Sequence, residues 1–196
     1  MILPVRPHYI FDQVKGDRSI TIPIPGREPG SPTLLETFLL MAIGKIVLSC
    51  RPGNGAIHPA EIFEIGTFAG STTANLAANF PQAQITTLDI DASRAREKLR
   101  QFDNVKQVQA HSMAFDFRAG FQKFSLVFVD GGHDLTTMES DTENAFRMIL
   151  PPSNQAAIVW HDFGHPAYPG VAQCLTARPE PIYHVEDSQM AVYFRN

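Results

Sequence analysis

Polar side chains follow five apolar segments of the sequence, and several of them can bind a metal ion or transfer a proton. They lie at residues 66–72, 89–91, 111–113, 130–133 and 161–162. Carboxylates and imidazoles are ligands for Mg, Mn, Fe or Zn. An unperturbed imidazole, with a pKa of about 6.5, also suits proton removal near neutrality. These residues could therefore support metal-assisted or acid–base chemistry if the fold brings the segments together.

The elements around these polar residues predict an α/β protein. Strands are predicted over 61–65, 84–90, 105–110, 124–130 and 156–162, and helices over 33–49, 71–80, 92–102 and 136–150. Strands that alternate with helices favour right-handed crossovers and a doubly wound, parallel sheet. Two last apolar runs, 181–185 and 190–194, predict a C-terminal antiparallel hairpin at the sheet edge. Ligands of such sheets bind at the carboxyl ends of the strands, where the five polar segments lie.

The length of 196 residues predicts a single domain. Prolines at positions 4, 7, 23, 25, 29 and 32 exclude a continuous helix before residue 33 and predict an extended N-terminal arm over 1–32. Residues 33–196 then form the domain. The arm could act as a lid, as a dimer arm or in simple packing, so a homo-oligomer is one option.

Composition and charge narrow the partners and the compartment. Hydrophobic residues make up 44% and charged residues 18% of the chain, as in ordered globular proteins. Sixteen Lys and Arg against twenty Asp and Glu give a net charge of -4, which disfavours nucleic acid and anionic membranes as partners. Two cysteines and an N-terminus without a signal-peptide pattern favour a cytoplasmic protein.

The turn after the first strand predicts a nucleoside site rather than a dinucleotide site. A dinucleotide turn, G-x-G-x-x-G, would need glycine where Phe68 and Ser71 stand. Gly66 and Gly70 form G-x-x-x-G instead, which permits close approach of the backbone to a ligand without phosphates. Asp89, at the end of the second strand, could accept hydrogen bonds from two ribose hydroxyls.

Four segments together resemble a known family. Glu64-Ile-Gly-Thr-Phe-Ala-Gly-Ser-Thr72, Leu88-Asp-Ile-Asp91, Phe128-Val-Asp-Gly-Gly-His133 and Val159-Trp-His-Asp162 are similar to segments of class I S-adenosylmethionine-dependent methyltransferases. The V-D-G-G-H and W-H-D motifs resemble those of a small O-methyltransferase-like group. The resemblance covers residues 33 to about 175, and it implies a Rossmann-like methyltransferase fold with a seven-stranded sheet.

The resemblance also implies roles for individual residues. The residues implied to surround S-adenosylmethionine are Glu64, Gly66, Thr67, Phe68, Gly70, Ser71, Thr72, Asp89, Ile90, Ser112, Met113 and Asp130. Asp130, His161 and Asp162 are the implied ligands of a divalent metal such as Mg, although the family usually has Asp or Glu where His161 stands. His133 is the implied general base, and with Asp130 it makes up the implied catalytic residues.

The resemblance and the chemistry of these residues predict a methyltransferase that acts on a hydroxyl of a small-molecule acceptor with metal assistance. A sugar or polyol is one candidate acceptor. One alternative is an oxygenase-like or hydrolytic enzyme on the same fold, because two His and one carboxylate could form a facial triad. Another is a binding protein that keeps the cofactor pocket without turnover.

Overall fold

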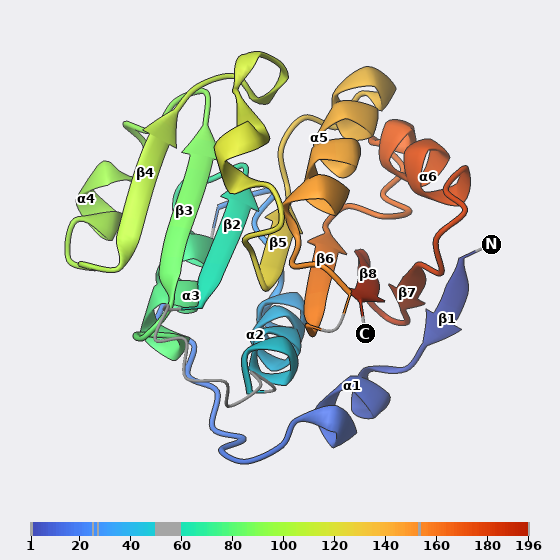
Figure 1. The fold of residues 1–196 in the computed structure, drawn as a ribbon, viewed down its shortest axis with the longest axis horizontal. Coiled ribbons are helices and arrows are strands. Elements are labelled where there is room, and N and C mark those ends of the chain that lie inside the picture. The colour runs from blue at the N-terminus through green and yellow to red at the C-terminus, as the bar shows by residue number, and fades with distance from the viewer. Residues whose placement is uncertain (1, 25, 27, 50–59, 153, 196) are drawn as a thin grey trace.

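The computed structural model describes residues 2–24, 26, 28–49, 60–152 and 154–195. They form a sheet of eight strands in the order β1-β7-β8-β6-β5-β2-β3-β4 (Figure 1). The strands are β1 Leu3–Val5, β2 Glu61–Ile65, β3 Gln84–Asp89, β4 Val105–Gln109, β5 Leu126–Val129, β6 Ala156–Trp160, β7 Tyr183–Val185 and β8 Met190–Arg195. All neighbours pair in parallel except β8, which is antiparallel to both β6 and β7. The predicted α/β sheet with a C-terminal antiparallel hairpin is confirmed, with eight strands instead of seven.

Helices cover both faces of the sheet. They are α1 Pro7–Gln13, α2 Leu34–Ser49, α3 Ser71–Asn79, α4 Arg96–Leu99, α5 Leu135–Met148 and α6 Pro169–Thr176, with 3-10 turns η1 Ser112–Ala114 and η2 Phe117–Gly120. Successive side chains of a strand point to opposite faces. Ala157 and Val159 of β6 therefore pack in the core under α1, α2 and α3, whereas Ile158 and Trp160 pack in the core under α5 and α6. The strong apolarity of β6 follows from burial on both faces.

The N-terminal arm contains a strand and a helix, which corrects the prediction that it is extended. Leu3–Val5 forms the edge strand β1, and Pro7 occupies the first turn of α1, where a missing N–H leaves no hydrogen bond unmade. Farther along, the amides of Asn75 and Asn79 on α3 each bond both the N–H and the C=O of an arm residue, Ile24 and Thr21 respectively. These paired bonds fix the arm along α3.

Two helices also differ from the predictions. The predicted helix 92–102 is helical only at Arg96–Leu99. Asp91 accepts hydrogen bonds from the N–H and hydroxyl of Ser93, a local bond that favours turns over helix. Helix α6 is not among the predicted helices, because it begins in a segment rich in Gly and Pro, which favours a loop. In the structure Pro169 is the first residue of this helix, a position that proline fits.

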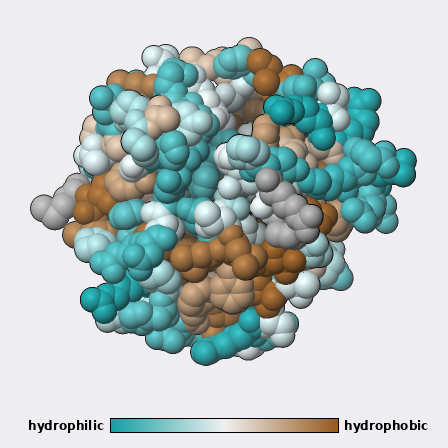
Figure 2. All heavy atoms as spheres, turned by 180° about the vertical axis from the view of Figure 1, so that it is seen from behind, coloured by the Kyte–Doolittle hydropathy of each residue, from teal (hydrophilic) through white to brown (hydrophobic). Residues whose placement is uncertain are grey.

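Among the described residues, no helix has the length and apolar content needed to cross a membrane. Seen from behind, the molecule has interspersed hydrophilic and hydrophobic residues, and hydrophobic residues gather below the centre (Figure 2).

The order of the strands indicates where the sheet can bind a ligand. From β2 the chain continues to β3 and β4 on one side, and it returns to β5 and β6 on the other. The carboxyl ends of β2 and β5 thus meet where the strand order reverses, the usual ligand site of open α/β sheets.

Candidate active site

A cavity of about 470 Å³ opens over the carboxyl ends of β2, β3 and β5. This first cavity is within the size range of small-molecule sites. Of the residues predicted to surround a cofactor, it is lined by Gly66, Thr67, Phe68, Ser71, Thr72, Asp89, Ile90, Ser112 and Asp130. Residues that the sequence did not point to complete the wall, among them Gly30, Ser31 and Pro32 of the arm and Tyr168 before α6.

The loop after β2 is held in an unusual shape by Asp89. One carboxylate oxygen of Asp89 accepts hydrogen bonds from the backbone N–H groups of Thr67 and Phe68, at 2.8 and 2.7 Å. Phe68 has a φ of +47°, a left-handed conformation that is uncommon for a bulky residue. The guanidinium of Arg94 lies 4.4 Å from the centre of the Phe68 ring. Asp89 therefore organises the loop itself, in addition to presenting a carboxylate at the cavity.

The charges along the first cavity suit a ligand without phosphate groups. Its described lining contains the carboxylates of Asp89, Asp130 and Asp134, and no Lys or Arg. Phosphate sites in proteins normally present cationic side chains. The lining thus agrees with the nucleoside predicted from the G-x-x-x-G turn.

Three predicted cofactor residues lie outside the lining. Gly70 has a φ of +76° and forms the N-cap of α3, and Met113 is directed to solvent with 47% of its surface exposed. Glu64 is fully buried, and its carboxyl accepts hydrogen bonds from the hydroxyls of Thr73 and Thr87 beneath the loop. Burial raises the pKa of Glu64 to about 8, with smaller opposing effects from these hydroxyls. Glu64 is thus a buried neutral carboxyl near pH 7.

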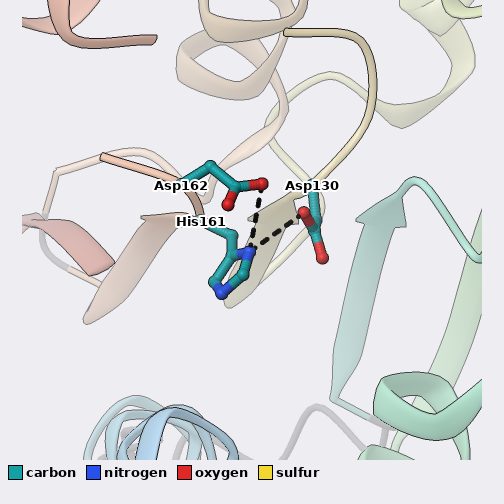
Figure 3. Close-up of side chains that lie close together, drawn as sticks. All are labelled: Asp130, His161 and Asp162. Atoms are coloured by element: carbon teal, nitrogen blue, oxygen red, sulfur yellow. Dashed lines mark ion pairs between the residues drawn. The ribbon is translucent and has the colours of Figure 1, made fainter. Parts of the chain in front are cut away.

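Asp130, His161 and Asp162 come together at the ends of β5 and β6. Nδ1 of His161 lies 3.3 Å from a carboxylate oxygen of Asp130 and 3.3 Å from one of Asp162 (Figure 3). One donor atom from each residue fits within 4.8 Å of the others, which is compatible with a shared metal ion. Asp162 has a φ of +59°, a conformation that Asp tolerates better than most residues. Among the described residues, the group that fits one ion in this way is one His with two carboxylates.

The charges of the cluster depend on one another. Burial disfavours the imidazolium of His161, but Asp130, Asp162 and Glu36 outweigh burial and raise its pKa to about 12. Burial likewise opposes ionisation of Asp162, yet His133 and His161 hold the pKa of Asp162 well below its usual range. Without a metal, His161 is therefore a cation, and a divalent ion bound to Nδ1 would displace the proton on that nitrogen.

His133 lies beside this cluster. Its Nε2 is 2.8 Å from a carboxylate oxygen of Asp162, and its ring stacks on Tyr168 with 4.0 Å between ring centres. His165 also stacks on Tyr168, at 4.7 Å. His133 and His165 thus both stack on one tyrosine.

A second cavity, of about 570 Å³, adjoins the first. The two cavities share Gly30, Ser31 and Tyr168, and the second is also bordered by His161 and Asp162. Its remaining lining residues are Thr33, Glu36, His165, Asp187, Ser188 and Gln189. The cluster therefore lies where the two cavities meet.

Glu36 is a site residue that the sequence reasoning missed. The only local signal was Thr33-Leu-Leu-Glu36, the pattern of a helix capping box. The structure forms that box, with Glu36 accepting from the Thr33 N–H at 2.8 Å and Thr33 accepting from the Glu36 N–H at 3.3 Å. The cap of α2 thus lies at Thr33. Nothing in the pattern shows that the same carboxylate also reaches His161, 125 positions away.

This fold and this pair of cavities are those of a methyltransferase domain. The family model described as "Methyltransferase domain" matches residues 63–163, which is more than half of the chain, so the chain belongs to this family. The match spans the strands β2 to β6 whose ends form the site. No curated protein sequence matches the chain.

Solved structures with similar folds include several methyltransferases. An SAH-bound methyltransferase of Podospora anserina, PaMTH1, shares 14% sequence identity with this chain at a TM-score of 0.60. The matched region covers 96% of this chain and 86% of PaMTH1. An O-methyltransferase from Bacillus cereus in complex with SAH shares 14% sequence identity at a TM-score of 0.60. The matched region covers 85% of this chain and 82% of the O-methyltransferase. MycE of the mycinamycin biosynthetic pathway, in complex with Mg and SAH, shares 18% sequence identity at a TM-score of 0.51. The matched region covers 71% of this chain and 46% of MycE. The chain spans only 39% of another similar structure, the citrinin polyketide synthase CMeT domain. At these identities the likeness concerns the fold.

Proposed function

We propose that this protein transfers a methyl group from S-adenosylmethionine to a hydroxyl group of a small molecule, with assistance from a divalent metal ion. The observation that carries this proposal is the junction of two cavities at a cluster of two carboxylates and one imidazole. Asp130 lines the first cavity, His161 and Asp162 line the second, and the three side chains are within reach of one ion. A cofactor in the first cavity and an acceptor in the second would meet at this cluster.

The first cavity suits S-adenosylmethionine in shape and charge. When bound, S-adenosylmethionine supplies a methyl group on a positively charged sulfonium. Asp130 places a carboxylate on the wall of the cavity where β2 meets β5, and Asp89 places another at the end of β3. In the proposed role Asp89 accepts hydrogen bonds from ribose hydroxyls through lone pairs that the backbone N–H groups leave free. Ile90 and Ser112, which line the same cavity, would border the base.

The cluster suits a divalent ion because one of its donor atoms has no well-directed partner. Nδ1 of His161 is buried and faces both carboxylates, but it forms no properly aligned hydrogen bond with either. A metal ion bound between these groups would give the imidazole nitrogen and both carboxylates one common partner. A divalent ion held here would lower the pKa of an acceptor hydroxyl and fix its orientation. We assign its binding to Asp130, His161 and Asp162.

The second cavity supports a polar acceptor, in keeping with a sugar or polyol. The described part of its lining has Ser, Thr, Gln, His and carboxylate side chains and one tyrosine. It contains no aliphatic side chain. An apolar aromatic acceptor would find little surface to pack against. The lining also has no Lys or Arg to balance an anionic acceptor. The V-D-G-G-H and W-H-D segments further support an O-methyltransferase-like group.

Release of S-adenosylhomocysteine from S-adenosylmethionine, measured with a panel of neutral polyols and sugars, tests the proposal. We expect release that depends on the acceptor and is abolished by a chelator without loss of the folded domain. Asp162→Asn should lower turnover strongly, because Asn tolerates the same backbone conformation but provides a weaker metal ligand. Asp103→Asn, an exposed change away from both cavities, is the matched control. Binding of S-adenosylmethionine with no turnover on any acceptor would indicate a binding protein instead.

A further inference from the structure

Glu36 contacts the nitrogen of His161 that points away from the candidate metal ligands. Its Oε2 lies 3.3 Å from Nε2 of His161, and both side chains are 4% exposed. The opposite nitrogen, Nδ1, faces Asp130 and Asp162. In the close-up both dashed lines end on the same ring nitrogen, while the other nitrogen points away from the two aspartates (Figure 3).

We propose that Glu36 is a positioning residue that accepts the Nε2–H of His161 and so directs the lone pair of Nδ1 into the cluster. This inference rests on the proposed metal-assisted function. A neutral imidazole carries one N–H, and the hydrogen bond that it donates decides which nitrogen is free to bind a metal. Carboxylates that accept from a metal-binding histidine fix its tautomer and ring orientation in this way.

The surroundings of Glu36 hold its carboxylate in the required place. Oε1 accepts a hydrogen bond from the backbone N–H of Gln189 at 2.7 Å, and Oε2 accepts one from the N–H of Thr33 at 2.8 Å. The first of these joins the carboxylate to the loop before β8, and the second joins it to the start of α2. Both oxygens must therefore act as acceptors, and the third contact that completes the set is His161.

The same arrangement explains why an amide cannot replace this carboxylate. In Glu36→Gln one oxygen becomes an NH₂ group, which only donates. If the NH₂ faces Gln189, two donors meet there; if it faces Thr33 and His161, their two N–H groups lose their acceptor. Either orientation leaves a buried donor unsatisfied or releases the imidazole from its fixed tautomer.

Calorimetric titration of the full chain with Mn²⁺ tests the inference. We expect Glu36→Gln to bind Mn²⁺ about 10 to 100 times more weakly than the wild type, the usual effect of removing such a partner. Glu180→Gln removes a carboxylate that pairs with Arg178 outside both cavities, and it should keep wild-type affinity. Wild-type affinity in a folded Glu36→Gln protein would overturn the inference.

A measurement on the wild type covers the case in which Glu36→Gln does not fold, since Glu36 also caps α2. In the Zn²⁺-loaded wild type, ¹⁵N NMR should show a proton on Nε2 of His161 and none on Nδ1. A proton on Nδ1 would overturn the inference while leaving a metal site in place. If the wild type binds S-adenosylmethionine but neither Mn²⁺ nor Zn²⁺, the metal part of the proposed function fails and takes this inference with it.

Discussion

Gly66 lies so close to Asp130 that a Cβ atom on Gly66 would come within 1.9 Å of the carbonyl oxygen of Asp130. The two residues directly follow the neighbouring strands β2 and β5, and the Asp130 N–H donates to the carbonyl of Ile65 at 2.8 Å. Gly66 also has a φ of +94°, which favours glycine. The loop after β2 and the first residue of the cluster are therefore one packed unit.

Gly66→Ala should destabilise the domain strongly, because the new methyl group meets backbone atoms that cannot move away alone. We expect a loss of about 3 kcal/mol or more in the free energy of unfolding, measured by denaturant titration. Gly164→Ala is the matched control, since Gly164 has a φ of +81° but no atom lies within 4 Å of the point where its new methyl group would stand. That change should cost only the conformational strain of about 1 kcal/mol. Equal losses in the two variants would show that strain, and not contact with Asp130, explains the requirement for glycine.

Asp89→Ala should weaken binding of S-adenosylmethionine by about tenfold to a hundredfold, the value of a lost charge-assisted hydrogen bond. Since Asp89 also holds the N–H groups of Thr67 and Phe68, the variant loses part of the loop shape as well. Calorimetry measures the affinity, and a melting curve shows whether the loop change spreads. An unchanged affinity in the folded variant would remove Asp89 from the cofactor site.

The sequence predicted those parts of the site that depend on local pattern and sheet direction. Asp130, His161 and Asp162 each follow an apolar strand, and parallel strands bring their carboxyl ends to one edge, so their proximity was foreseeable. Glu36 was not foreseeable, because its contact with His161 depends on how α2 packs across the sheet. The helix α1 was also missed, because the prolines of the arm were interpreted as helix breakers. Proline is compatible with the first turn of a helix, and Pro7 occupies that position in α1. The resemblance assigned Glu64 to the cofactor site. In the structure its side chain is buried, and its carboxyl accepts a hydrogen bond from the hydroxyl of Thr87.

The buried carboxyl of Glu64 should make stability fall as pH rises. Its folded-state pKa is raised from 4.5 to about 8, so the folded protein keeps the proton while the unfolded chain loses it. The contribution is fully present below pH 4.5 and is lost as pH rises through 8, at up to about 1.4 kcal/mol per pH unit. Thermal melts of the wild type and Glu64→Gln at about pH 5 to 9 measure the difference, which should shrink or reverse in favour of Gln at high pH. Parallel curves over this range would contradict the assigned protonation.

Asn75→Ala should release the arm from α3 and weaken cofactor binding at a distance. The Asn75 amide is buried and bonds both backbone groups of Ile24, while arm residues 29–32 line the first cavity. We expect a loss of about 2 kcal/mol of stability for the two bonds and faster trypsin cleavage after Arg18. Asn79→Ala, which removes the equivalent but exposed bonds to Thr21, should have a smaller effect. Cleavage at Arg18 that is no faster in Asn75→Ala would show that the arm is held by other contacts.

His133→Ala should lower turnover by about a hundredfold to ten-thousandfold, the usual contribution of a general base. Nε2 of His133 lies 2.8 Å from Asp162, and the ring is stacked on Tyr168 between the two cavities, so the imidazole is oriented beside the proposed metal site. The affinity for S-adenosylmethionine should change little. His165→Ala is the control, because His165 stacks on the same Tyr168 and borders the second cavity but has no contact of this kind with Asp162. If His165→Ala lost turnover and His133→Ala kept it, His165 would be the base. If neither change mattered, activation of the hydroxyl would have to come from the metal ion or from the acidity of the acceptor itself.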